Sequence, residues 1–384
     1  MKSISIKDIK LYPIALPLVE PLRTSFGMEP YKGAIAIEVV TENGISGWGE
    51  CSAAPDPGYT GETMGTAHHI LHNYMLGLVK GKTITDPREI REILRVIRYH
   101  EHAKHGLEAA VWDAFAKAND LRLTDLLASY LPDGHESRGK ATVGVSIGLQ
   151  PTMDDLFAII DKRVGQGYNR IKLKIKPGQD IDIAKATRNR YPDTMIMLDA
   201  NSAYTLADAD HLAQLDDYDL LMIEQPLSHD DIYEHSKFAK RMKTPICLDE
   251  SIKNVNDLRL AIEVGAIGIL NLKPARVGGF AECLDIYNVC VEHDLPLWVG
   301  GMLEVGVGRA ANISLASLPA VTMPSDISAT DRYFDPDLTE PPFVLGEEST
   351  LAVADGIGIG VEVQRDRLEE AVATWEKEKS YQLG

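Results

Sequence analysis

Five short apolar runs in the middle of the chain each end in one ionisable side chain, and they recur at nearly constant spacing. The residues are Lys174 in "RIKLKIKPG", Asp199 in "MIMLDAN", Glu224 in "LLMIEQP", Asp249 in "PICLDES" and Lys273 in "GILNLKP", at intervals of 25, 25, 25 and 24 residues. A buried parallel strand reads as a short apolar run, and one strand–helix unit takes about 25 to 30 residues. We therefore expect five successive strand–helix units that deliver these side chains to one rim of a barrel.

The order of the charges predicts a bound metal ion. Three carboxylates from neighbouring strands repel one another unless a cation lies between them. One oxygen ligand from each strand suits Mg²⁺ better than zinc, which prefers nitrogen and sulfur. A single Asp or Glu at a strand end is commonly a helix cap or a solvated loop residue. Five such positions at regular spacing favour a shared catalytic site instead.

The pattern over all 384 residues predicts an α/β fold with two domains. Strand-like alternation with an Asn43-Gly44 hairpin turn is followed by helical periodicity, which predicts an α+β domain over residues 1–125. Residues 126–334 alternate strand and helix as a barrel does, with a seventh strand in "LPLWVGGML" and an eighth in "AVTMPSD". We expect segment 335–384 to pack back on the first domain and complete it.

Composition excludes several classes of partner. The net charge of −18 argues against nucleic acid and anionic membranes. Apolar residues make up 45% of the chain, but no run approaches the roughly 20 residues of a membrane helix. The start, "MKSISIKDIKLYPIALP", alternates as a strand and not as an export signal, which predicts a cytoplasmic protein. The four cysteines form no CxxC pair, as expected of reduced thiols.

Two histidine-rich stretches raise the alternative of a metal site on a helix. "HHILH" places His68 and His72 four residues apart, and "HEHAKH" covers residues 100–105. Neither matches the H-E-x-x-H motif of zinc hydrolases, and neither follows a buried strand. We expect both to be solvated helix faces.

Lysines on either side of a carboxylate–metal cluster predict removal of a proton next to a substrate carboxylate. The enediolate that forms needs strong electrostatic stabilisation, which a divalent cation supplies. Lys174 can act as the base if burial, Lys172 and the metal lower its pKa. With Lys273 on the opposite face, deprotonation and reprotonation give racemisation, whereas loss of a β-hydroxyl gives dehydration. The residue chemistry alone leaves both outcomes open.

Two other classes fit parts of the pattern. A Schiff-base aldolase also carries a lysine on a barrel strand, but the three carboxylates argue against it. A barrel that only binds or assembles would not need an intact set of lysines and carboxylates.

The motifs "IKLKIKPG", "LDAN", "IEQPL", "CLDES" and "LKPARVGG" resemble the muconate-lactonising-enzyme subgroup of the enolase superfamily, and the likeness covers essentially the whole chain. It implies a modified TIM-type (β/α)7β barrel with an α+β capping domain. It also implies that Asp199, Glu224 and Asp249 bind Mg²⁺, with Mn²⁺ as a substitute. Lys174 and Lys273 would then be the acid/base pair.

The same resemblance implies further site residues. Lys172 would hold the substrate carboxylate. Asn201 and Glu250 resemble partners of the metal ligands, although a plain capping role fits them equally well. The remaining residues assigned to substrate binding are Phe26 and Tyr59, on loops that close over the substrate, together with Ser146 and Arg276. Arg276 is similar to an arginine of racemase members, and its alternative is a surface ion pair.

Within the subgroup, "PLRTSFG", "GYTGET", "GGMLEVGVGRA" and "MPSDISATDRYF" resemble o-succinylbenzoate synthases that also racemise N-succinylamino acids. This implies a lyase of menaquinone synthesis with N-succinylamino acid or other N-acylamino acid racemase activity. The alternatives are a dedicated N-acylamino acid racemase, a muconate cycloisomerase or a dipeptide epimerase. Ser325-Asp326-Ile327 stands where the epimerases carry Asp-x-Asp, which argues against the last. We expect a small carboxylate substrate and a homo-oligomer, a dimer or higher.

Overall fold

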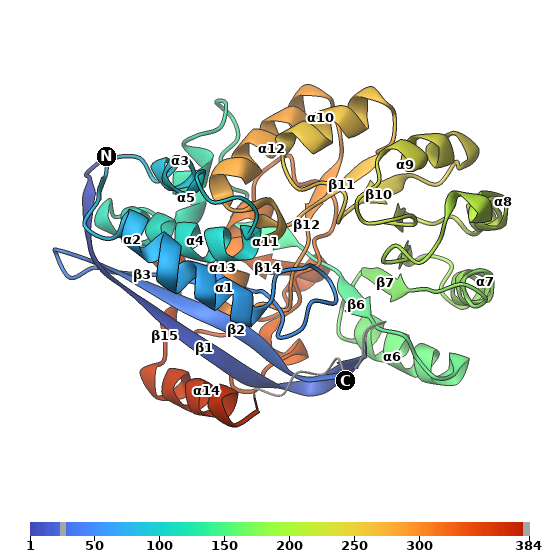
Figure 1. The fold of residues 1–384 in the computed structure, drawn as a ribbon. Helices are drawn as coiled ribbons and strands as arrows, with labels where there is room; N and C mark the ends of the chain where they lie inside the picture. Colours follow the sequence, from blue (N-terminus) through green and yellow to red (C-terminus); the bar gives the residue numbers. More distant parts are fainter. Residues whose placement is uncertain (24–27, 379–384) are drawn as a thin grey trace.

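The computed structural model describes residues 1–23 and 28–378 and begins with an antiparallel sheet, drawn in blue in Figure 1. Its strand order is β3–β2–β1–β4, with β1 Ile4–Arg23, β2 Met28–Thr41, β3 Ser46–Cys51 and β4 Thr83–Ile84. Asn43 and Gly44 lie in the turn between β2 and β3, and Gly44 adopts a φ of 80° that favours glycine. The predicted hairpin is therefore present.

Helices gather beside one face of this sheet. They are α1 Met64–Ile70, a π-helical turn at Leu71–Met75, α2 Leu76–Val79, α3 Glu89–Leu94, α4 Glu101–Ala118 and α5 Leu123–Ala128. Of these, α1 and α4 contact the strands, and α3 and α5 pack on α4. The long α4 lies directly on β3 because Gly47 and Gly49 have no side chains. A Cβ atom at Gly47 would stand 2.2 Å from the carbonyl oxygen of Ala110, and one at Gly49 would stand 2.1 Å from that of Gly106. Glycine thus permits the close contact between helix and sheet.

The prediction for the histidine-rich stretch at residues 100–105 is wrong. His102 and His105 are buried, and burial lowers the pKa of each to about 3. The reason is that α4 lies between the sheet and the barrel, where the ring of His105 meets the ring of Phe280 edge-on. His72, in the other stretch, is exposed, and His68 is half-buried.

The second part is a sheet of seven parallel strands in the order β12–β11–β10–β9–β8–β7–β6 (Figure 1). The strands are β6 Val145–Ile147, β7 Arg170–Lys174, β8 Met195–Asp199, β9 Ile223–Glu224, β10 Ile246–Leu248, β11 Ile269–Leu272 and β12 Leu297–Val299. The connecting helices are α6 Met153–Gly165, α7 Asp180–Arg190, α8 Ala209–Leu212, α9 Tyr233–Phe238, α10 Val255–Glu263, α11 Pro274–Val277, α12 Phe280–Glu292 and α13 Gly306–Ala316. This is the alternation that the sequence predicts.

A short extended segment closes the sheet into a barrel. Its two backbone bridges run parallel to the chain on either side, from Asp326 to Gly300 and from Ser325 to Val143. The predicted eighth strand in "AVTMPSD" is thus reduced to single bridges, because only its last residues reach both neighbours. The predicted fold class, a modified barrel with an α+β cap, is confirmed.

The barrel interior determines where the rim residues lie. Five side chains, Met197, Met222, Cys247, Ile269 and Trp298, form a separate apolar cluster inside the ring of strands. Side chains two residues apart on a strand point to the same side. The residues that follow Met197, Met222 and Cys247 by two are Asp199, Glu224 and Asp249, which therefore lie above this layer at the carboxyl ends of the strands.

The last part of the chain returns to the first sheet. Strand β13 Thr339–Glu340 pairs with β15 Glu362–Val363, and β14 Thr350–Ala352 pairs with β5 Lys140–Thr142. Helix α14 Arg365–Glu378 packs on β1, and Arg365 forms an ion pair with the buried Glu38 of β2. Helix α14 of the tail thus packs on the first sheet, while the predicted domains, with boundaries at 125 and 335 and the tail completing the first, stay predictions. Within the described ranges, no helix is both long and apolar enough to cross a bilayer.

Candidate active site

Three buried carboxylates lie side by side at the carboxyl ends of neighbouring strands. Asp199 ends β8 and pairs in register with Glu224, which ends β9, while Asp249 follows β10 directly. Each is at most 1% exposed. The spacing in the sequence therefore corresponds to a real convergence at one rim.

The two predicted acid/base lysines lie on opposite sides of these carboxylates. Lys174 ends β7, and its Nζ lies 2.6 Å from Oδ2 of Asp199. Lys273 follows β11, and its Nζ lies 2.7 Å from Oδ2 of Asp249. Since β8, β9 and β10 stand between β7 and β11, a ligand bound at the carboxylates would have one amine on each side.

The charges at this rim perturb one another. Burial raises the pKa of Glu224 to about 8, and the charge of Asp199 adds to the effect. Burial also favours the neutral form of Asp199, but Lys174 and Lys172 outweigh it and lower the pKa of this carboxyl. For Lys172, burial opposes the charge, yet Asp326, Glu224 and Asp199 raise its pKa well above the ordinary value. The carboxylates at this rim are therefore close enough together to stabilise a positive charge placed between them.

The donor set fits a hard divalent cation. Three carboxylates from adjacent strands supply oxygen ligands only, as Mg²⁺ and Mn²⁺ require, and Oε2 of the neighbouring Glu250 is buried without a hydrogen-bond partner. In the chain as far as it is described, no three His, Cys, Asp or Glu side chains form a ready metal cage. The amino groups of Lys172, Lys174 and Lys273 contact carboxylate oxygens instead. A bound ion would take their place at these oxygens.

Asn201 and Glu250 contact the site as partners of its charged groups. The side-chain amide of Asn201 donates to Oε1 of Glu250 at 3.2 Å, and its oxygen accepts from Nζ of Lys174. Its backbone N–H donates to Oδ1 of Asp199 at 3.1 Å. Asn201 therefore connects Lys174 with two carboxylates, Asp199 and Glu250, which is more than a capping role requires.

Of the four remaining residues assigned to substrate binding, the structure describes Tyr59, Arg276 and Ser146. The hydroxyl of Tyr59 accepts from Nζ of Lys273 at 2.7 Å and lies 3.0 Å from both oxygens of Asp249. Arg276 is buried and not in a surface pair: it contacts Asp249 and donates to the backbone oxygens of Ile252 and Asn271. Ser146 pairs in register with Lys172. Phe26 lies outside the described residues.

Sequence reasoning missed two further polar residues. Asn271 donates from Nδ2 to Oε1 of Glu224 at 2.5 Å. A polar residue inside the apolar run "GILNLKP", two positions before Lys273, was an available signal. Asp326 lies 2.8 Å from Nζ of Lys172 and 3.3 Å from Arg170. A signal was available here too, because Asp326 is the last residue of the predicted eighth strand "AVTMPSD".

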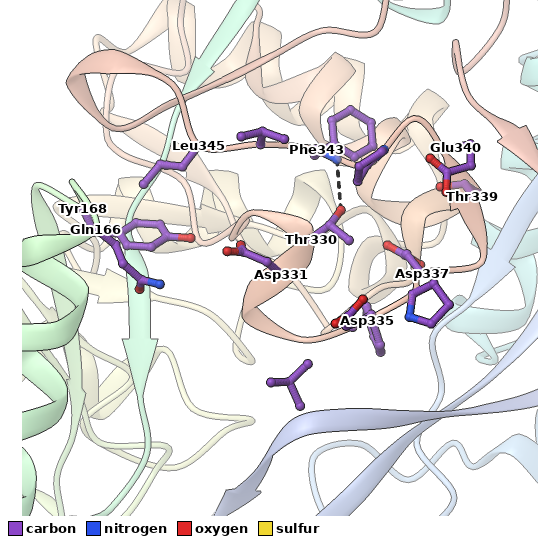
Figure 2. Close-up of a pocket in the computed structure, with 15 residues that line it drawn as sticks. Gln166, Tyr168, Thr330, Asp331, Asp335, Asp337, Thr339, Glu340, Phe343 and Leu345 are labelled. Atoms are coloured by element: carbon purple, nitrogen blue, oxygen red, sulfur yellow. Dashed lines mark hydrogen bonds between the residues drawn. The ribbon is translucent and has the colours of Figure 1, made fainter.

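The described structure has a cavity at each end of the barrel. A cavity of about 430 Å³ opens over the carboxyl ends of the strands and is lined by Lys174, Asn201 and Gln179 among others. A second, of about 580 Å³, lies at the opposite end, where Tyr168 precedes β7 and meets the tail residues Asp331 to Leu345 (Figure 2). Its described lining residues include carboxylates but no lysine or arginine. The first cavity is therefore the candidate substrate site.

Comparisons with known proteins match almost the whole chain. Residues 7–128 match the N-terminal domain of the mandelate racemase / muconate lactonizing enzyme family, and residues 156–367 match the enolase C-terminal domain-like family. An o-succinylbenzoate synthase of Bacillus subtilis is 42% identical over 96% of this chain and 97% of its own length. An N-succinylamino acid racemase of Amycolatopsis is 41% identical over 95% and 97%. A crystal structure of an enolase superfamily member from Listeria innocua, 41% identical, superposes with a TM-score of 0.90 over 96% and 97% of the two chains.

Proposed function

The chain belongs to the mandelate racemase and muconate lactonizing enzyme family of the enolase superfamily, and from this premise we propose that it is an o-succinylbenzoate synthase that also racemises N-succinylamino acids. Relatives with each of these names are about equally similar to the chain. The observation that carries the proposal is the pair of lysines on β7 and β11, on either side of three buried carboxylates.

Both reactions begin with the same proton transfer. Lys174, as the neutral amine, removes the proton from the carbon next to the substrate carboxylate, and the electron pair moves into that carboxylate to form an enediolate. Asp199, Glu224 and Asp249 would hold Mg²⁺, which when bound stabilises the negative charge on the enediolate oxygens. Lys172 contributes a positive charge for the same carboxylate. Asn201 holds the amine of Lys174 in place.

The outcome depends on what leaves or returns next. In the dehydration, the electron pair re-forms a carbon–carbon double bond as the β-hydroxyl departs, which with a proton yields water and o-succinylbenzoate. In the racemisation, Lys273 delivers a proton to the opposite face of the carbon, so the configuration inverts. The hydroxyl of Tyr59 contacts the amine of Lys273 and completes that side of the site.

The decisive experiment compares the two activities side by side. Purified enzyme with Mg²⁺ is assayed with the cyclohexadiene carboxylate precursor of o-succinylbenzoate and with a panel of N-succinylamino acids. We expect activity with both, and loss of both on chelation with recovery on addition of Mg²⁺ or Mn²⁺. An enzyme that, with metal present, turned over neither the cyclohexadiene carboxylate nor any N-succinylamino acid would rule the proposal out.

Single-lysine variants test the two-base scheme. K174A and K273A should each lose racemisation by about 10³-fold or more, as expected when an acid/base group is removed. In D₂O, K273A should still exchange the α-proton of the enantiomer whose α-proton points towards Lys174. K174A should exchange only the α-proton of the opposite enantiomer. K253A is the matched control, because Lys253 is an exposed lysine four residues beyond Asp249. Substantial racemisation by either catalytic variant would contradict the scheme.

We further propose that the dehydration serves menaquinone synthesis and that the enzyme is a cytoplasmic homo-oligomer. The four cysteines are all free and buried, as a reducing compartment permits. A dedicated N-acylamino acid racemase is the second candidate, and Arg276 is the residue that favours it. Negligible dehydration beside efficient racemisation would select that alternative.

A further inference from the structure

One ammonium group at the barrel rim contacts three different carboxylates. Nζ of Lys172 lies 3.2 Å from Oδ2 of Asp199, 3.2 Å from Oε2 of Glu224 and 2.8 Å from Oδ2 of Asp326. The first two carboxylates belong to the proposed metal site and the third does not. An ammonium at that distance from two ligands repels a divalent cation and occupies oxygen atoms that the cation needs.

Asp326 is held as a fixed anion at the seam of the barrel. Its backbone N–H donates to the carbonyl oxygen of Val299 at 2.9 Å, in the bridge that closes the barrel. Its other carboxylate oxygen lies 3.3 Å from the fully buried guanidinium of Arg170, which also donates to the carbonyl oxygen of Pro324. The ring of Trp298 lies below both cations, 5.3 Å from Nζ of Lys172. The carboxylate therefore faces Lys172 from a rigid support.

We propose that Asp326 is a positioning residue that draws the ammonium of Lys172 away from Asp199 and Glu224, so that these two carboxylates are free to bind a divalent cation. The inference rests on the metal site of the proposed function. Of the three carboxylates that contact Lys172 in the described structure, Asp326 lies outside the ligand set and makes the shortest contact. When Asp326 is lost, the ammonium stays on the ligands and competes with the metal.

Direct metal binding tests this role without substrate. Mn²⁺ is titrated into metal-free, full-length protein, and the free ion is measured by electron paramagnetic resonance. D326N should bind Mn²⁺ at least tenfold more weakly than the unmodified protein, whereas K172M, which removes the competing ammonium, should bind as tightly or more tightly. In the K172M background, D326N should change the dissociation constant less than threefold. D331N, an exposed aspartate five residues further on, is the matched control and should bind normally.

The double variant separates this role from two simpler ones. If Asp326 acted only through its charge on the metal, the tenfold loss would persist in the K172M background, and that result overturns the inference. If Asp326 only stabilised the fold, D326N would lower the melting temperature of the metal-free protein without changing Mn²⁺ affinity. That result also overturns the inference. If D326N does not fold, K172M decides: binding tenfold weaker than in the unmodified protein overturns the inference.

Kinetics gives a second readout. D326N should need at least tenfold more Mg²⁺ for half-maximal activity, while kcat at saturating Mg²⁺ returns to within threefold of the unmodified enzyme. Failure of the proposed reaction has a different signature: a protein with the expected pattern of Mn²⁺ affinities that neither dehydrates nor racemises overturns the proposed function and leaves the role of Asp326 intact.

Discussion

Replacing Gly300 by alanine should damage the acid/base group on one side of the site more than the other. Gly300 follows β12, beside the end of β11, and its missing side chain leaves room for two site residues. A Cβ atom there would stand 2.1 Å from Oδ1 of Asn271 and 2.6 Å from Cε of Lys273, which is 1.3 Å and 0.8 Å short of the 3.4 Å where ordinary contact begins. Lys273 and Asn271 must both move, whereas Lys174 on β7 is untouched.

The size of the effect follows from these overlaps. A displacement of about 1 Å at a catalytic group costs roughly 10²-fold in rate, and an extra methyl in a packed interior costs about 1–3 kcal/mol of stability. We expect G300A to lose about 10²-fold in kcat for racemisation, for which Lys273 is the proposed acid. The loss for dehydration should be about tenfold, because there we propose that Lys273 contributes mainly its charge. Both activities are measured at saturating Mg²⁺, together with urea unfolding.

The control for G300A is G165A. A Cβ atom at Gly165, in α6, meets nothing within 4 Å, so this variant should keep full activity and gain about 0.5–1 kcal/mol of stability. Racemisation by G300A within twofold of the unmodified enzyme would refute the reasoning, and so would equal losses in the two reactions.

Three other changes give expectations that differ in kind. Y59F removes the hydroxyl that contacts Lys273 and should lower kcat/KM about tenfold in both reactions, the equivalent of one hydrogen bond of roughly 1.5 kcal/mol. T152A removes the cap that accepts from the backbone N–H of Asp155 and should cost about 1 kcal/mol in urea unfolding with no change in kinetics. Burial raises the pKa of Glu50 from 4.5 to about 8, so its stabilising effect is complete below pH 4.5 and is lost as the pH rises through 8. The melting temperature should therefore fall between pH 5 and 8.5, and E50Q should flatten that fall; an unchanged slope would contradict the assignment.

The barrel and its charged rim could be predicted because both obey a period. Parallel strands with helical returns repeat at an almost fixed length, and each strand delivers the residue at its end to the same rim, so Lys174 to Lys273 were found by counting. Family likeness then supplied the roles. Contacts that depend on packing across the two domains follow no such period. The burial of His102 and His105 between sheet and barrel could not be read from the local pattern.

Asp326 shows the limit most directly. Asp326 ends the predicted eighth strand, and the folded strand makes one bridge to each neighbour. The strand-end position alone does not show which charged groups surround it. Its importance arises only when the barrel closes and brings Arg170 and Lys172 to its carboxylate. The same holds for Tyr59, whose contact with Lys273 joins residues 214 positions apart. Such contacts are a property of the folded chain.

The charged residues at the barrel rim do not by themselves select between the two reactions. In the proposed mechanism, dehydration and racemisation share the proton transfer at Lys174 and the charged intermediate that follows, so the same lysines and carboxylates would serve both. What differs is the shape of the substrate: one is a ring that carries a β-hydroxyl, the other a flexible amino acid with an N-acyl group. Groups that sense shape must approach from above the strand ends, where Tyr59 of the first domain already touches Asp249 and Lys273. Exchanging the loop around Tyr59 for that of a relative with the other preference should therefore shift the ratio of the two activities and leave Mg²⁺ affinity unchanged. If dehydration and racemisation instead changed by the same factor, the residues that select the reaction would lie in the barrel.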